Sequence, residues 1–90
     1  MIVGYHVKVT GRVQGVGFRY YTKLEADKLG LRGTVKNEPD GSVTIQVIGP
    51  DKVVGAFLEW CHKGPATALV DGLDYSESLT LEADGFEILR

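Results

Sequence analysis

Apolar residues occupy every second position near the start of the chain, at Val3, Tyr5, Val7 and Val9. This period of two predicts a strand with one face on a hydrophobic core. The same alternation recurs over residues 43–47, and residues 32–37 are typical of a shorter strand. Proline presets the first central position of a turn and glycine accepts a positive φ. The intervening Glu38-Pro39-Asp40-Gly41 therefore predicts a hairpin.

Two segments have the longer period of an amphipathic helix. Their apolar faces comprise Phe18, Thr22, Ala26 and Leu29 in the first segment, and Val53, Phe57, Trp60 and Cys61 in the second. Gly30 is placed to cap the first helix in a left-handed conformation, while Gly64-Pro65 ends the second. Residues 68–75 have strand character with a shift of apolar parity that indicates a bulge near Gly72, and residues 86–89 could add a short last strand.

The order strand, helix, strand, strand, helix, strand predicts an α+β fold. We expect a ferredoxin-like sandwich (βαββαβ), in which an antiparallel sheet has two helices packed on one face. Ninety residues suit one small domain over residues 1–90. The net charge is −2 and the ten Lys and Arg residues are scattered, so we expect no nucleic-acid partner. A single cysteine and the lack of a leader or long apolar segment indicate a soluble, cytoplasmic protein without membrane contact. We also expect a monomer, although these features do not bear on the oligomeric state.

Residues 11–19 join the first predicted strand to the first predicted helix, and they contain three glycines and a final arginine. Glycines let consecutive backbone N–H groups turn toward one point, where the helix adds the positive end of its dipole. Arg19 adds a two-pronged donor that matches a phosphoryl group. No Lys-Ser or Lys-Thr follows, which excludes a Walker A loop, and Tyr20 stands where a dinucleotide fingerprint needs glycine. The loop is therefore either a structural turn or a site for a single phosphate group.

Two separated motifs resemble those of a known family. They are Gly11-Arg12-Val13-Gln14-Gly15-Val16-Gly17-Phe18-Arg19 and Gly33-Thr34-Val35-Lys36-Asn37, the latter followed by Asp40-Gly41-Ser42-Val43. In this order, and with the chain length and the helix pattern near Trp60, they resemble the acylphosphatase family over nearly the whole chain. Thr34 departs from the family, which often carries a large aromatic residue there, and this affects the packing expected beside the second strand.

The resemblance implies hydrolysis of the carboxyl–phosphate bond of small acyl phosphates to a carboxylate and inorganic phosphate, with no metal and no other cofactor. It implies that Arg19 and Asn37 are catalytic, Arg19 by holding the phosphoryl oxygens and Asn37 by orienting the attacking water. It also implies phosphate binding by the backbone N–H groups of Gln14, Gly15, Val16, Gly17, Phe18 and Arg19. Inorganic phosphate or sulfate is then expected to compete with the substrate, since each is an anion of the same shape.

Hydrolysis of an acyl phosphate needs neither a general acid nor a metal, which is consistent with the types of catalytic residue that the sequence lacks. Its leaving group is a carboxylate with a pKa of about 4, which departs without a general acid. The sequence has no Cys/His nucleophile pair and no metal-ligand cluster, and we expect His6 and His62 at the surface and Cys61 in the core. Two alternatives remain open: a non-catalytic module that binds an anion or a partner protein, and an RNA-recognition module. The second needs stacking aromatic residues that residues 43–47 lack.

Overall fold

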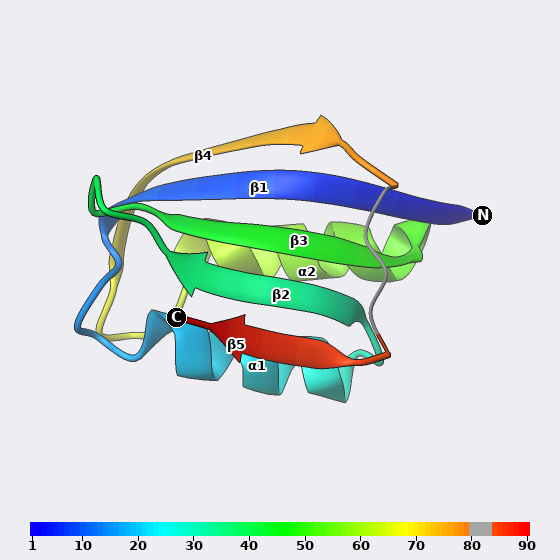
Figure 1. Ribbon diagram of the computed structural model, residues 1–90, viewed down its shortest axis with the longest axis horizontal. Helices are drawn as coiled ribbons and strands as arrows, with labels where there is room; N and C mark the ends of the chain where they lie inside the picture. The colour runs from blue at the N-terminus through cyan, green and yellow to red at the C-terminus, as the bar shows by residue number, and fades with distance from the viewer. Residues whose placement is uncertain (80–83) are drawn as a thin grey trace.

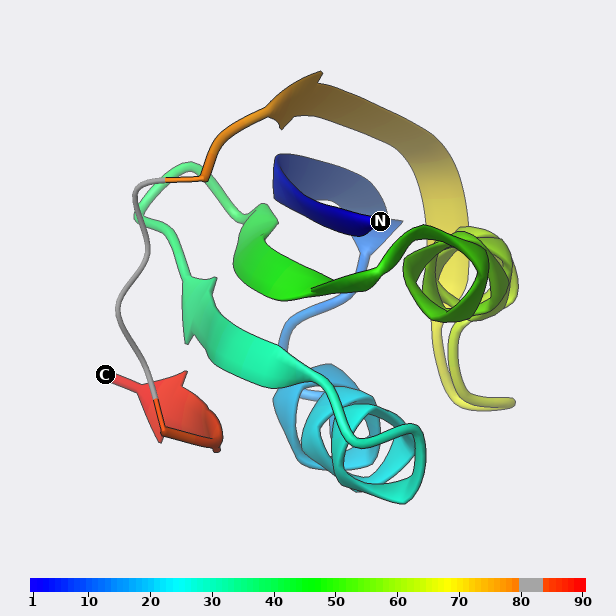
Figure 2. The same ribbon diagram turned by 90° about the vertical axis from the view of Figure 1, so that its right-hand side faces the viewer.

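A computed structural model describes residues 1–79 and 84–90 of the chain. Its elements are β1 (Ile2–Arg12), α1 (Phe18–Lys28), β2 (Arg32–Asn37), β3 (Val43–Pro50), α2 (Asp51–Lys63), β4 (Leu69–Glu77) and β5 (Phe86–Leu89). The strands form one sheet in the order β4-β1-β3-β2-β5 (Figure 1). Both helices lie on one face of this twisted sheet (Figure 2). The predicted ferredoxin-like α+β architecture is confirmed.

The sheet is mixed rather than wholly antiparallel. The pairs β1·β3, β1·β4 and β2·β3 are antiparallel, but β5 pairs parallel to β2, with Gly33 opposite Phe86. Strands β4 and β2 run in opposite directions. Because β5 runs opposite to β4 and pairs at the β2 edge, β5 is parallel to β2. The end of β5 therefore lies beside the end of β2.

The core fills the space between the sheet and the two helices. Its fully buried side chains include Val7, Val9, Val13, Phe18, Val35, Val43, Ile45, Val47, Val54, Phe57 and Cys61. On α2 the predicted face is confirmed at Phe57 and Cys61, which are buried, while Val53 and Trp60 are partly buried and pack against the core. The prediction missed Val54, which is fully buried. The face in contact with the sheet follows Val54, Phe57 and Cys61, spaced three and four residues apart, so Val53 and Trp60 flank it. Burial raises the pKa of the Cys61 thiol, as expected of a core cysteine.

The predicted ends of the elements are largely confirmed. Helix α1 ends at Lys28, and Gly30 follows with a φ of 70°. The N–H of Leu31 donates to the carbonyl of Ala26 at 2.9 Å, which completes a Schellman closure. The predicted bulge lies at position 71, because Thr10 pairs with Gly72 while the next residue of β1 pairs with Val70. This bulge lets β1 continue to Arg12, two residues into the glycine-rich motif.

Alternation along β2 decides which of its residues face the helices. Gly33 and Val35 are buried on the helix side, so Asn37 shares that side, whereas Thr34 faces the opposite, open side. Thr34 is half-buried there, between Gln46 of β3 and Glu87 of β5. A threonine in place of an aromatic residue at this position therefore leaves the core between sheet and helices unchanged.

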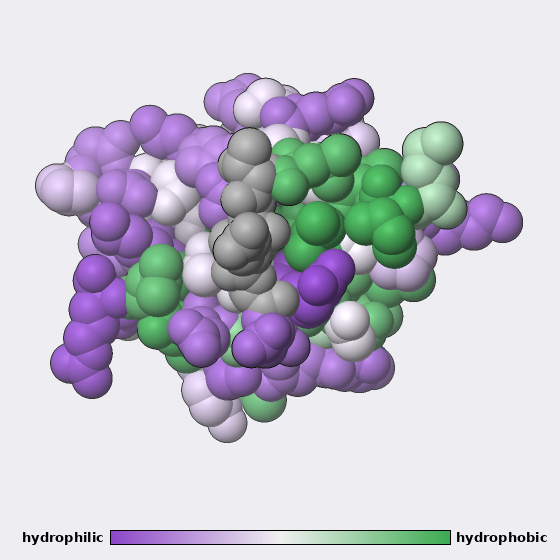
Figure 3. Space-filling model, turned by 45° about the vertical axis from the view of Figure 1, so that its right-hand side comes forward, coloured by the Kyte–Doolittle hydropathy of each residue, from purple (hydrophilic) through white to green (hydrophobic). Residues whose placement is uncertain are grey.

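On the face that Figure 3 shows, hydrophilic residues predominate, and the largest hydrophobic area lies at the upper right. Among the residues that the structure describes, no helix is long and apolar enough to cross a lipid bilayer. His6 and His62 are both exposed, as predicted. Within the same residues, no three His, Cys, Asp or Glu side chains are grouped closely enough to hold a metal ion.

Candidate active site

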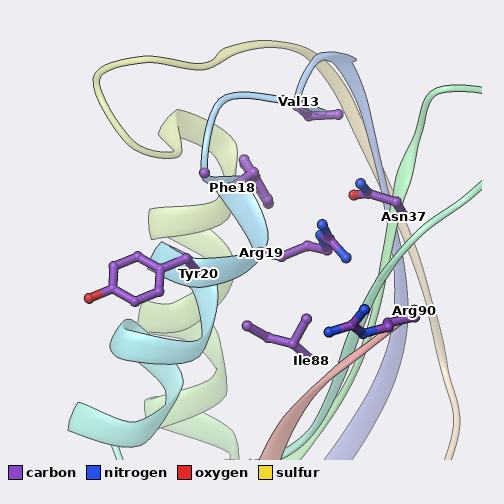
Figure 4. A pocket seen from close by; sticks show the side chains of 9 residues that line it. Val13, Phe18, Arg19, Tyr20, Asn37, Ile88 and Arg90 are labelled. Atoms are coloured by element: carbon purple, nitrogen blue, oxygen red, sulfur yellow. The ribbon is translucent and has the colours of Figure 1, made fainter.

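Three segments that are distant in sequence meet at one end of the sheet: the loop from β1 to α1, the end of β2 and the end of β5 (Figure 1). They surround a pocket of about 400 Å³, within the range of roughly 300–1,000 Å³ usual for small-molecule sites. The pocket is lined by Val13, Gly15, Gly17, Phe18, Arg19, Tyr20, Asn37, Ile88 and Arg90. Arg19 and Asn37 extend toward each other across it (Figure 4). The two residues assigned catalytic roles from the sequence thus share one pocket.

The loop before α1 has the backbone conformation that its glycines allow. Gly15 and Gly17 have φ values of 74° and 81°, in the left-handed region that side chains with a Cβ rarely adopt. Gly17 is the N-cap of α1, no side chain caps that end of the helix, and its first turn has no acidic residue. The first N–H groups of a helix have no partner within the helix, and the dipole places partial positive charge there. The geometry suits an anion at the pocket wall.

Buried contacts hold this loop in place. Phe18, the first residue of α1, is buried in the core, with its ring 6.0 Å from that of Trp60. The Thr67 hydroxyl donates to the carbonyl of Val16 at 2.6 Å. Val16 and Gln14 belong to the predicted phosphate loop but are not among the residues that line the pocket. Both connect the loop to the rest of the fold.

Gln14 joins the loop to the β2–β3 hairpin. Its side-chain Nε2 donates to the carbonyls of Glu38 and Ser42, each at 2.8 Å. Glu38 is the residue immediately after Asn37, and its N–H donates to the same Ser42 carbonyl at 2.9 Å. These bonds fix the position of Asn37 relative to the loop that faces it. From the sequence, Gln14 was expected only to donate its backbone N–H to the phosphate.

Replacing Gln14 by methionine, which has a similar length but no donor, is expected to lower both stability and turnover. Loss of two hydrogen bonds should lower the free energy of unfolding by about 1–3 kcal/mol. A loosened Asn37 should lower kcat by about tenfold or more, while phosphate affinity falls much less. Denaturant unfolding, kcat and the inhibition constant of phosphate measure the three effects. Gln46→Met, on the open face of β3, is the matched control, and equal losses in the two variants would contradict this role of Gln14.

Asn37 has a side-chain atom available for a ligand. Its Oδ1 is buried and accepts no hydrogen bond, one of two such side-chain atoms among the described residues. A buried acceptor without a partner costs free energy, so an unpaired one at a pocket wall favours binding of a hydrogen-bond donor such as water. The Asn37 side chain faces Arg19 across the pocket (Figure 4).

The turn after Asn37 is held by Asp40. Its carboxylate accepts bonds from the hydroxyl and N–H of Ser42, at 2.6 and 2.9 Å, and from Lys8 Nζ at 2.9 Å. The Ser42 hydroxyl and the Lys8 ammonium hold the pKa of Asp40 well below its usual range. Since folding lowers this pKa, the contribution of Asp40 to stability is present above its unfolded pKa, about 4, and is lost as the pH falls. The contribution of Asp40 to the stability of the turn is therefore fully present at neutral pH.

Sequence reasoning missed four residues that line the pocket: Val13, Tyr20, Ile88 and Arg90. Val13 and Tyr20 adjoin the predicted loop residues, so proximity in the sequence could have indicated them. Ile88 and Arg90 come from the other end of the chain, and only the parallel pairing of β5 with β2 brings them to Asn37. Arg19 itself contacts this strand, because its Nη1 lies 3.4 Å from the Leu89 carbonyl.

The fold and the pocket define a ferredoxin-like α+β protein in which a glycine-rich loop and Arg19, at the N-terminus of α1, face Asn37 across a pocket. The acylphosphatase family profile matches residues 5–88. The chain is 57% identical to an acylphosphatase of Nocardioides sp. over 68 residues, covering 76% of this chain and 69% of that one. It is 49% identical to an acylphosphatase of Rhizobium meliloti over 85 residues, 93% of this chain and 90% of the other. A crystal structure of acylphosphatase from Bacillus subtilis superposes with a TM-score of 0.93 at 42% identity, covering 100% of both chains.

The chain therefore belongs to the acylphosphatase family and is an enzyme of this kind. This result replaces the non-catalytic and RNA-binding alternatives that the sequence left open. The open face of the sheet also argues against RNA recognition, because β3 presents Thr44 and Gln46 there rather than stacking aromatic residues.

Proposed function

We propose that this enzyme hydrolyses the carboxyl–phosphate bond of small acyl phosphates, without a metal ion, by direct attack of a water molecule on phosphorus. The observation that carries the proposal is the shared pocket of Arg19 and Asn37 beside the N-terminus of α1. The phosphoryl oxygens bind the backbone N–H groups of the loop at residues 14–19 and the Arg19 guanidinium. These donors stabilise the charge that develops in the transition state.

The leaving group explains why so few side chains are needed. A carboxylate with a pKa of about 4 departs as an anion at neutral pH, so the bond breaks without proton transfer to the leaving oxygen. The pocket lining contains neither histidine nor a carboxylate side chain that would serve as a general acid. The catalytic effect then comes from positioning and from charge stabilisation.

Asn37 positions the attacking water in this proposal. Its unpaired Oδ1 accepts one O–H of the water and directs the water oxygen toward phosphorus, in line with the bond that breaks. The Gln14 bonds to Glu38 and Ser42 keep that carboxamide at a constant distance from the phosphate loop. In a loose transition state, the new bond between the water oxygen and phosphorus has hardly formed. An oriented water molecule is therefore a sufficient nucleophile without a general base.

The test compares benzoyl phosphate with phenyl phosphate as substrates. Benzoyl phosphate should be hydrolysed and phenyl phosphate should not, because the phenolate leaving group has a pKa of about 10, as in tyrosine, and needs a general acid. Release of inorganic phosphate measures both reactions. Lack of turnover of benzoyl phosphate by the folded protein would refute the proposed activity.

Chelation of divalent ions is expected to leave the hydrolysis of benzoyl phosphate unchanged. The phosphoryl charge is neutralised by the arginine and the N–H groups, so a Lewis acid has no role in this mechanism. The measurement is kcat before and after dialysis against EDTA, with a sample to which Mg²⁺ is restored as the control. Loss of activity that Mg²⁺ reverses would show that the metal-free mechanism is wrong.

Inorganic phosphate and sulfate are expected to compete with the substrate, because each meets the same donors as the phosphoryl group. In a phosphate titration, the amide chemical shifts of residues 14–19 should change most, and inhibition should raise KM without changing kcat. Sodium chloride at equal ionic strength is the control. Shifts centred on His62 and the rest of α2 would place the anion site elsewhere.

A further inference from the structure

The pocket contains a second guanidinium group, which the proposed reaction does not use. Arg90 follows β5 and lines the same pocket as Arg19 and Asn37. Figure 4 shows its side chain pointing into the pocket beside Arg19. No ion pair or hydrogen bond of Arg90 with another described residue is present, and none of the lining side chains is acidic. No side chain of the described residues therefore neutralises the guanidinium of Arg90.

Arg90 and Arg19 differ in position. Arg19 is partly buried, lies in the first turn of α1 and is held near the Leu89 carbonyl at 3.4 Å. Arg90 is exposed and approaches from the strand on the other side of the pocket. A phosphoryl group at the loop meets Arg19 and the helix N-terminus first. The outer part of the pocket, where Arg90 lies, is left for the acyl portion of the substrate.

The size and charge of the pocket also support binding of the phosphoryl group near Arg19 and of the acyl portion near Arg90. A volume of about 400 Å³ is in the range of pockets that hold whole small molecules rather than a lone phosphoryl group. Two guanidinium groups facing one pocket repel each other, and this repulsion is relieved by a ligand with negative charge near each of them. An acyl phosphate with a neutral acyl portion places its charge only at the phosphoryl end. One with an anionic acyl portion places charge at both ends.

We propose that Arg90 selects acyl phosphates whose acyl portion carries its own negative charge, such as the monophosphates of dicarboxylic acids. The inference rests on the proposed function, since it concerns the substrate of the same pocket. Arg90 is in this role a specificity-determining residue that attracts the distal carboxylate. In this role Arg90 contacts neither the attacking water nor the atoms of the bond that breaks.

The test compares benzoyl phosphate with 4-carboxybenzoyl phosphate, which has the same ring and an added carboxylate. Wild-type enzyme should have the higher kcat/KM for the carboxylated substrate at low ionic strength. In Arg90→Gln this ratio should fall by about threefold to tenfold, the size expected of one exposed charge interaction, because kcat/KM for the carboxylated substrate falls more than kcat/KM for benzoyl phosphate. Arg90→Lys should keep most of the preference, and added salt should reduce it in the wild type.

The matched control is Arg32→Gln, which removes an exposed arginine at the other end of β2. Its substrate ratio should equal that of the wild type, and thermal unfolding should show that both variants remain folded. An unchanged ratio in Arg90→Gln would overturn the inference. Equal losses for the two substrates would also overturn it, because Arg90 would then act on the phosphoryl group. If wild-type enzyme hydrolyses neither substrate, the proposed function itself fails, which is a different result from either of these.

Discussion

Asn37→Ala is expected to lower kcat by about 100-fold or more, while inorganic phosphate still binds. The phosphate donors lie in the loop and in Arg19, so they remain, but the water loses the acceptor that aligns it with phosphorus. The expected result is a large fall in kcat with a phosphate inhibition constant close to that of the wild type. Steady-state kinetics with benzoyl phosphate and a phosphate inhibition series measure both quantities.

The control for this variant is Thr34→Ala, on the same strand but facing the open side of the sheet. It should retain wild-type kinetics. Because Asn37 immediately precedes the hairpin at residues 38–41, thermal unfolding of Asn37→Ala must be measured as well. A folded Asn37→Ala enzyme with near-normal kcat would show that Asn37 is only a residue of the turn, and that another group positions the water.

Arg19→Lys is expected to remove most of the activity although the charge is preserved. A single ammonium cannot reproduce two parallel N–H donors aimed at phosphoryl oxygens. Loss of such a donor to a developing charge costs on the order of 3 kcal/mol, which corresponds to about a hundredfold in kcat/KM. Kinetics with benzoyl phosphate measure the loss, and phosphate affinity should also fall, in contrast to Asn37→Ala.

The matched control is Arg32→Lys, the same replacement at an exposed position at the start of β2. It should leave kcat/KM unchanged. Near-native kinetics in Arg19→Lys would mean that only positive charge matters at this position, and the proposal of bidentate binding would then be wrong.

Much of the fold could be predicted because its signals are local. Alternation in β1 and β3 is a property of neighbouring residues, and the burial of Val7, Val9, Ile45 and Val47 follows from it. The predicted Gly30 cap and the bulge in β4 are local in the same sense, since each depends on the chemistry of a few consecutive residues. The prediction missed Val54 on α2 because helix periodicity leaves a choice between adjacent rows of residues, and the angle at which the helix packs on the sheet decides between them.

The candidate site also combines residues that could be predicted from the sequence with contacts that only the tertiary structure shows. The glycine loop with Arg19, and Asn37 before a turn, were found from the sequence together with a family resemblance, and the structure brings these residues to one pocket. The side-chain bonds of Gln14 and the unpaired Oδ1 of Asn37 are contacts across the fold, so no short stretch of sequence contains them. The site roles themselves stay predictions until the variants are measured.

The sequence by itself determined the order of strands and helices, the family, the position of the glycine loop and the two residues assigned catalytic roles. These depend on local periodicity, on turn chemistry and on motif spacing, which act over a few residues. Only the tertiary structure decided that β5 runs parallel to β2 and that Ile88 and Arg90 line the pocket opposite α1. Such contacts join residues far apart in the chain, and they depend on which sheet edge a strand reaches and on how the helices pack, neither of which local sequence specifies.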